Sequence, residues 1–163
     1  MNNSQSEIRN PKSRHILVVD DEPTILKLVA TRLKLAGHRV SVAMDGQAAI
    51  VRVHEEPPPD LIILDLMLPK LNGYDVCAML KQDDRYRRIP IIMFTALKSD
   101  DEYWKGMACG ADAYLTKPHS GEELQQIVGR LINAVAPADQ AQPAAGTPPI
   151  LGEPSGPTGA AHV

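Results

Sequence analysis

The chain has 163 residues, of which 44% are hydrophobic and 23% are charged. This length suits one well-buried domain and is too short for two domains of ordinary size. Acidic residues outnumber basic ones by only 20 to 17, so the net charge predicts no direct nucleic-acid binding. The polar start does not resemble a signal peptide, and no apolar run reaches membrane-spanning length. We therefore expect a cytoplasmic protein that is not inserted in a membrane.

The two ends of the chain differ in composition from its middle. Residues 1–13 are rich in Asn and Ser and lack hydrophobic periodicity, which predicts a disordered lead-in. Residues 135–163 are rich in Pro, Ala and Gly, which predicts a disordered tail that acts as a tether, a docking segment or neither. One folded domain is left over residues 14–134. The cysteines Cys77 and Cys109 lack metal-ligand spacing and are expected to be reduced and buried.

Short apolar runs alternate with longer helical patterns along this middle part. Unbroken apolar runs predict parallel strands that are covered on both faces, and weaker runs predict strands nearer the sheet edges. The unbroken runs are Ile16–Val19, Leu61–Leu64 and Ile91–Phe94, and the weaker runs are His38–Met44 and Ala113–Thr116.

Five helices are expected between and after these strands. The first follows Pro23, where apolar residues recur every three or four positions. Ser99 and Ser120 each precede a glutamate by three residues, the spacing of a capping box, so helices should begin there. The other two are expected near Gly46–Glu55 and Tyr74–Gln82. Strands and helices in alternation, joined by right-handed crossovers, predict a three-layer α/β sandwich.

The residues that directly follow the strands are polar. Ligands of an open parallel sheet bind at the carboxyl ends of its strands, where this sequence places Asp20, Asp21, Asp65, Thr95 and Lys117. Carboxylates that meet at one edge repel one another, and oxygen-only ligands favour a hard divalent cation such as Mg²⁺. Lys117 and the Thr95 hydroxyl would supply a positive charge and a donor for a phosphoryl group. Asp65 would then be equipped to attack phosphorus and carry an acyl phosphate.

Each of these residues has a plainer interpretation when it is taken alone. The Asp20–Asp21 pair would cap the first helix, Asp65 would be a loop residue, Thr95 a strand-end hydroxyl, and Lys117 a solvated lysine in a turn. Together these interpretations fail, because they require four separate strand ends to acquire complementary chemistry by accident.

Four segments resemble the receiver domains of bacterial two-component response regulators. They are Val18–Pro23, Asp65–Pro69 with Asn72–Gly73, Thr95–Ala96 and Gly110–Pro118. Their order and spacing are like those of the family over about His15 to Asn133. The resemblance implies a flavodoxin-like (βα)5 fold with the parallel sheet order 2-1-3-4-5. No effector-domain pattern follows Asn133, so a stand-alone receiver is expected rather than a DNA-binding regulator.

The resemblance also implies how the acidic residues act. Asp65 would accept a phosphoryl group from a histidine kinase or a histidine phosphotransfer protein. Asp20, Asp21, Asp65 and the backbone carbonyl of Met67 would hold Mg²⁺. The chain would then be a phosphoacceptor that assists its own phosphotransfer and dephosphorylation, and not an enzyme.

The remaining site residues receive roles from the same resemblance. Lys117 and Thr95 would contact the phosphoryl group, and Thr95 and Tyr114 would form a conformational switch. The peptide bond between Lys117 and Pro118 is expected to be cis, which proline permits at low cost.

Three other interpretations are weaker. A haloacid-dehalogenase-type phosphatase also uses an aspartate nucleophile and Mg²⁺, but it needs a second acid two positions later, where this chain has Met67. A flavin-binding flavodoxin-like protein needs a phosphate loop after the first strand, and Asp20 and Asp21 would repel a phosphate there. A degenerate receiver, acting as a phosphorylation-independent interaction module, is disfavoured by the complete set of site residues.

Overall fold

The computed structural model describes residues 12–135 apart from 56, 97–98 and 119. Its strands pair in parallel as one five-stranded sheet in the order β2-β1-β3-β4-β5. The strands are His15–Val19 (β1), Arg39–Ala43 (β2), Leu61–Leu64 (β3), Ile91–Thr95 (β4) and Ala113–Thr116 (β5). The helices are Pro23–Leu35 (α1), Gly46–His54 (α2), Gly73–Gln82 (α3), Asp100–Ala108 (α4) and Gly121–Ala134 (α5). The predicted fold and strand order are confirmed, with the two weaker apolar runs at the edges.

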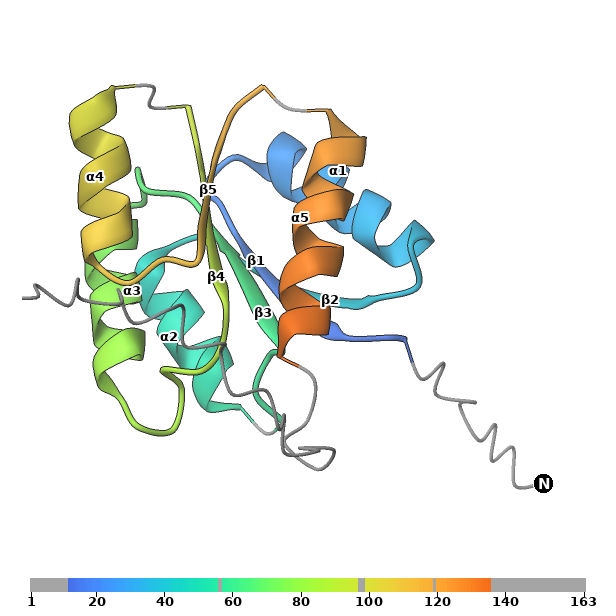
Figure 1. The fold of residues 1–163 in the computed structure, drawn as a ribbon, viewed down its shortest axis with the longest axis horizontal. Helices are drawn as coiled ribbons and strands as arrows, with labels where there is room; N and C mark the ends of the chain where they lie inside the picture. The colour runs from blue at the N-terminus through green and yellow to red at the C-terminus, as the bar shows by residue number, and fades with distance from the viewer. Residues whose placement is uncertain (1–11, 56, 97–98, 119, 136–163) are drawn as a thin grey trace, which may run out of the picture.

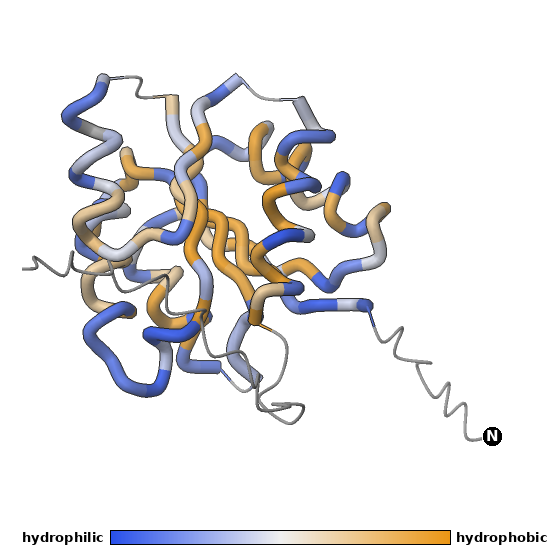
Figure 2. The backbone as a smooth tube through the Cα atoms, in the orientation of Figure 1, coloured by the Kyte–Doolittle hydropathy of each residue, from blue (hydrophilic) through white to orange (hydrophobic). Residues whose placement is uncertain are grey.

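Helices cover both faces of the sheet. The pair α1 and α5 lies on one face, and α2, α3 and α4 lie on the other (Figure 1). Successive strand residues point to opposite faces, so Ile16 and Val18 enter the core under α1 and α5, whereas Leu17 and Val19 enter the other core. Every side chain of β3 is 0% exposed, which explains why its sequence shows no polar alternation. Figure 2 shows the resulting apolar centre.

The helix starts follow the capping signals in the sequence. The Ser120 side chain accepts a hydrogen bond from the amide three residues later at 3.3 Å, and α5 begins directly after it. Helix α4 begins directly after Ser99. Asp45 and Asn72 cap α2 and α3 in the same way, at 2.7 and 2.9 Å. None of the helices in the described part of the chain has both the length and the apolar character that crossing a membrane requires.

The predicted lead-in and tail fall almost entirely outside the described residues. Of residues 1–13 the structure describes only 12 and 13, and of residues 135–163 only 135. The disorder of both segments and the domain limits of 14 and 134 therefore stay predictions.

Gly73 allows the segment after β3 to pass close to the carboxyl end of that strand. A Cβ at this position would lie 2.2 Å from the backbone oxygen of Asp65 and 2.8 Å from the Cα of Leu66. Both are backbone atoms, so a side-chain rotation cannot relieve the clash. We expect Gly73→Ala to lower the free energy of unfolding by about 1 to 3 kcal/mol, as overpacking does, in a urea titration.

Gly129 in α5 offers a matched control for this substitution. A Cβ at Gly129 would meet nothing within 4 Å. Alanine favours a helix interior over glycine by about 0.5 to 1 kcal/mol, so Gly129→Ala should stabilise the protein. Destabilisation by both variants to the same extent would contradict the close approach at Gly73.

Candidate functional site

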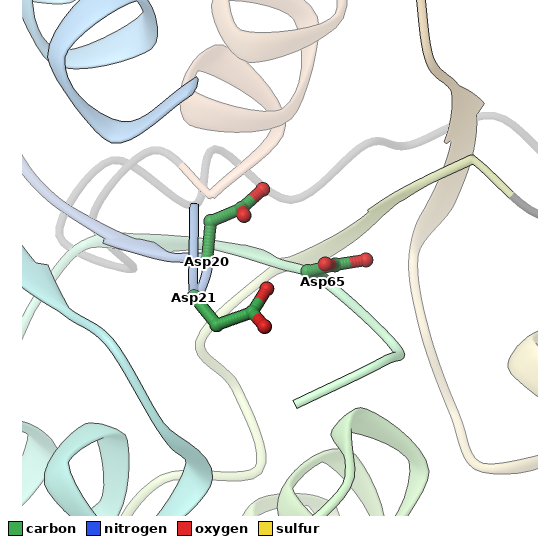
Figure 3. A group of neighbouring side chains, drawn as sticks. All are labelled: Asp20, Asp21 and Asp65. Atoms are coloured by element: carbon green, nitrogen blue, oxygen red, sulfur yellow. The ribbon is translucent and has the colours of Figure 1, made fainter. Parts of the chain in front are cut away.

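The carboxyl ends of β1 and β3 bring three aspartates together (Figure 3). Asp20 and Asp21 directly follow β1, and Asp65 directly follows β3. One carboxylate oxygen from each lies within 4.8 Å of the other two. Backbone hydrogen bonds hold Asp20 and Asp65 in place. The Asp20 amide donates to the Ala43 carbonyl at 3.1 Å, and the Asp65 amide donates to the Val19 carbonyl at 2.9 Å. These bonds extend the parallel pairing past the strand ends.

Lys117 reaches the same cluster from the segment after β5. Its Nζ forms an ion pair with Asp20 and lies 3.4 Å from Oδ2 of Asp65. Its amide donates to the Thr95 carbonyl at 2.7 Å, which ties the segment to the end of β4. The peptide bond between Lys117 and Pro118 is cis. The structure thus brings together at one sheet edge the five side chains that the sequence singled out.

The Asp65 carboxyl group is mostly buried and surrounded by opposing influences. Burial raises the pKa of Asp65, and the negative charge of Asp20 adds to this rise. The ammonium of Lys117 and hydrogen bonds from the Leu66 amide and the Thr95 side chain act to lower it. The Leu66 amide donates to Oδ1 at 2.8 Å. Because burial is the largest influence, the net pKa shift is upward.

This upward shift predicts how the stability of the metal-free protein depends on pH. The folded protein binds the Asp65 proton more tightly than the unfolded chain does, so stability falls as pH rises from the usual pKa of 3.8 to the raised folded value. Asp65→Asn removes this loss of stability, because the asparagine side chain does not ionise. We expect a higher free energy of unfolding for the variant near neutral pH in chelator, and a difference that shrinks toward acidic pH.

Asp84→Asn is the control for that comparison. The Asp84 side chain is 87% exposed and its ion pair with Arg87 is a surface pair, which contributes little. Its substitution should change stability only slightly at either pH. A metal-free Asp65→Asn protein that is less stable than wild type near neutral pH would contradict the dominance of burial.

The donor set at this edge suits a hard divalent cation. Asp20 is 1% exposed and Asp65 is 6% exposed, whereas Asp21 is exposed to solvent. One ammonium, that of Lys117, cannot balance three carboxylates in a partly desolvated site. The cluster offers only oxygen ligands and has one solvated side, which fits an ion such as Mg²⁺ that retains several waters. Asp20, Asp21 and Asp65 are the side chains that could hold it.

The residues expected to form the switch lie on neighbouring strands. Thr95 ends β4 and is 0% exposed, and Tyr114 lies on β5, which pairs with β4. The half-buried Tyr114 ring makes an edge contact with Tyr103 of α4, with the ring centres 5.4 Å apart. Gly106 of α4 faces the same ring, because a Cβ there would lie 3.2 Å from it. Tyr114 therefore packs directly against α4.

Some features of the site have little or no signal in the sequence. The Leu66 amide is a backbone donor, so its side chain gives no hint of its role. The Phe94 ring lies 5.3 Å from Nζ of Lys117, a cation–π contact that the apolar pattern of β4 does not predict. The Met67 side chain is 66% exposed, and the role of its carbonyl as a metal ligand stays a prediction.

One curated relative corrects an expectation from the sequence. The chain is 45% identical over 120 residues to the DNA-binding dual master transcriptional regulator RpaA of Synechocystis sp. (strain ATCC 27184 / PCC 6803 / Kazusa). The match covers 72% of this chain and 48% of RpaA, so the chain spans about half the length of this relative. The expectation of no direct nucleic-acid binding is therefore wrong, since this relative is a DNA-binding regulator. The net charge of this chain, which matches only about half of the regulator, cannot exclude DNA binding by a protein of that kind. The expectation that the receiver stands alone stays a prediction.

Solved structures and a family model agree with the fold. Chemotaxis response regulator CheY4 of Vibrio cholerae is 30% identical with a TM-score of 0.69, covering 73% of this chain and 98% of that one. The Mn²⁺-bound form of response regulator Rcp1 is 31% identical with a TM-score of 0.63, covering 72% and 91%. The model of the response regulator receiver domain matches residues 16–129. Members of this family are signalling modules and not classical enzymes. The chain thus belongs to the response regulator receiver domain family.

Proposed function

We propose that the chain is a phosphorylation-controlled signalling module in which Asp65 accepts a phosphoryl group. The observation that supports this most strongly is the convergence of Asp65 with two other aspartates and with Lys117, whose Nζ lies 3.4 Å from Oδ2 of Asp65. The donor is a phosphohistidine of a histidine kinase or a histidine phosphotransfer protein. An oxygen of Asp65 bonds to phosphorus, the bond from phosphorus to the imidazole nitrogen breaks, and an acyl phosphate remains.

The other site residues position and neutralise the transferred group. Asp20, Asp21, Asp65 and the backbone carbonyl of Met67 would hold Mg²⁺, which supplies positive charge for the phosphoryl oxygens when it is bound. Lys117 offers its ammonium to a phosphoryl oxygen. Thr95, already hydrogen-bonded to Asp65, offers its hydroxyl to another. Positioning and charge neutralisation are most of what phosphoryl transfer requires, so the chain assists its own phosphorylation and dephosphorylation.

Exposure to a small phosphodonor tests this function. Acetyl phosphate with Mg²⁺ should add one phosphoryl group, which hydroxylamine should remove as expected for an acyl phosphate. A purified phosphohistidine protein should deliver the same group. If neither donor labels the folded protein, the chain is the degenerate receiver that acts without phosphorylation.

The output of the module is proposed from its likeness to RpaA. That relative is named as a DNA-binding transcriptional regulator, and its match with this chain covers 48% of its length. Phosphorylation would therefore control a protein that acts on DNA, in the cytoplasm where such a kinase and such a target meet. Comparing the proteins captured by the phosphorylated and unphosphorylated chain tests this output.

Magnesium should bind the unphosphorylated protein and raise its melting temperature. The cation relieves repulsion among the folded-state carboxylates and has a lower affinity for the unfolded chain. At a concentration about ten times the Kd, the stabilisation is about 1.4 kcal/mol, which corresponds to roughly 5 °C. Asp21→Asn should remove most of this shift without opening the core, since Asp21 is exposed. Asp84→Asn should retain it, and an unchanged response in Asp21→Asn would place the cation elsewhere.

A further inference from the structure

The two cysteines of the chain meet between α3 and the end of α4, on the sheet face opposite α1 and α5. Cys77 lies in α3 and is 0% exposed, whereas Cys109 directly follows α4 and is partly exposed. The Cys77 thiol donates a hydrogen bond to the Cys109 backbone oxygen at 3.5 Å, and the ionisation of each thiol affects the other. The proposed phosphorylation chemistry uses neither sulfur.

The backbone holds Cys109 in a fixed position beside Cys77. The Cys109 amide donates to the Lys105 carbonyl and its Sγ donates to the Gly106 carbonyl, at 3.1 and 2.9 Å. Gly110, with a φ of 95°, then turns the chain away from the helix. The Cys109 sulfur therefore lies beside Cys77 directly after the last turn of α4, so a disulfide between the two would join this end of α4 to α3.

Charged and polar neighbours make Cys109 the more reactive of the two thiols. Lys81 of α3 places its ammonium 2.7 Å from Asp112 and close enough to both thiols to favour their ionised forms. Interaction with Cys77 is the main cause that lowers the pKa of Cys109, whereas interaction with Cys109 and burial raise the pKa of Cys77. A partly exposed thiol beside a cation is the kind that oxidants attack.

We infer that Cys77 and Cys109 form an oxidisable dithiol, in which Cys109 reacts first with a hydroperoxide and Cys77 resolves the product. In the first step the Cys109 sulfur bonds to one peroxide oxygen, the O–O bond breaks, and a sulfenic acid forms as the peroxide is reduced. In the second, the Cys77 sulfur bonds to the Cys109 sulfur, the S–O bond breaks, and water leaves with the Cys77 proton. Two thiols and one hydrogen peroxide become a disulfide and two waters.

The disulfide would fasten the end of α4 to α3. Helix α4 carries Tyr103 and Gly106, which contact the Tyr114 ring, so the bond would restrain the helix against which that ring packs. This inference does not depend on phosphorylation, and its chemistry can be measured on the unphosphorylated protein.

The test treats the reduced, full-length protein with hydrogen peroxide and follows it by intact mass and non-reducing peptide mapping. Because the chain has only 2 cysteines, a monomer that loses two hydrogen atoms can contain only this disulfide. We expect this mass, a cross-linked peptide pair that dithiothreitol separates, and slower amide hydrogen exchange at Cys109 and Gly110. Cys77→Ala should stop at a Cys109 sulfenic acid that dimedone traps, and Cys109→Ser should leave Cys77 unoxidised in the folded protein.

Two results would overturn the dithiol. One is a wild-type protein whose cysteines are alkylated separately after peroxide treatment, with no cross-linked peptide. The other is a covalent dimer formed through Cys109, which would mean that Cys109 reacts with a second chain and not with Cys77. Both readouts come from the wild type, so they remain decisive even if either variant folds poorly.

Discussion

Replacing Asp65 by asparagine should reduce phosphoryl incorporation from acetyl phosphate to background. The amide of asparagine has the shape of the carboxyl group but cannot form the acyl phosphate, because its oxygen carries no charge and its nitrogen is not nucleophilic. The fold should persist, since the Leu66 amide can still donate to the asparagine oxygen. Intact mass at near-neutral pH, followed by borohydride trapping of the aspartyl phosphate, measures the loss and locates the label in wild type.

The control for this experiment separates the nucleophile from its surroundings. Asp21→Asn weakens the metal site but retains Asp65, so it should slow labelling without moving the label. Asp84→Asn should behave like wild type, because its side chain is 87% exposed. Equal labelling of Asp65→Asn and wild type would mean that another side chain accepts the phosphoryl group, and the proposed function would lose its central residue.

Thr95→Ala should uncouple Tyr114 from the phosphorylation site. Phosphoryl oxygens are expected to draw the Thr95 hydroxyl from its hydrogen bond with Asp65 onto the phosphoryl group, and the space that Thr95 vacates is expected to admit the Tyr114 ring. This is a shift between two packings, and the phosphoryl group can bias it only by its preference for one of them. A coupling of about 1 to 3 kcal/mol changes partner affinity roughly 5- to 150-fold, and the alanine variant should lose most of it.

NMR with beryllofluoride, a stable phosphoryl mimic, measures this coupling. Wild type should show large shifts at Tyr114, Tyr103 and the rest of α4, and Thr95→Ala should show much smaller ones although it still binds the mimic. Thr116→Ala is the matched control, because Thr116 pairs with Thr95 across β4 and β5 and the same hydroxyl is removed one strand away. A Tyr114 ring that does not respond when wild type is saturated would disprove the switch.

The sheet was predictable because the physical causes of its strands are local in the sequence. The run from Leu61 to Leu64 is apolar at every position, and all four side chains are 0% exposed in the centre of the sheet. The edge strands gave weaker runs because β2 is partly solvated, with exposed or half-buried residues at four of its five positions. Strand order came from the family resemblance, since periodicity alone does not say which strands are neighbours.

The site was predictable in its side chains and not in its contacts. Residues that follow parallel strands must meet at one sheet edge, which is why Asp20, Asp65 and Lys117 could be grouped from the sequence. The sequence does not reveal that Lys117 pairs with Asp20, or that a glycine at position 73 approaches the Asp65 backbone closely enough to exclude a Cβ. Such facts depend on tertiary distances between segments tens of residues apart.

If Asp20 holds the cation and Lys117 contacts the phosphoryl group as proposed, the ion pair between them would couple the binding of the two ligands. Lys117 and a cation would compete for the Asp20 carboxylate. In the same way, Asp20 and a phosphoryl oxygen would compete for the Lys117 ammonium. A cation held by Asp20 would free Lys117 to contact the phosphoryl group, and a phosphoryl group contacted by Lys117 would free Asp20 to hold the cation. Reciprocity requires each ligand to raise the affinity of the other by the same factor, and a factor of ten corresponds to about 1.4 kcal/mol. The domain would thus respond weakly to either ligand alone and strongly to both together.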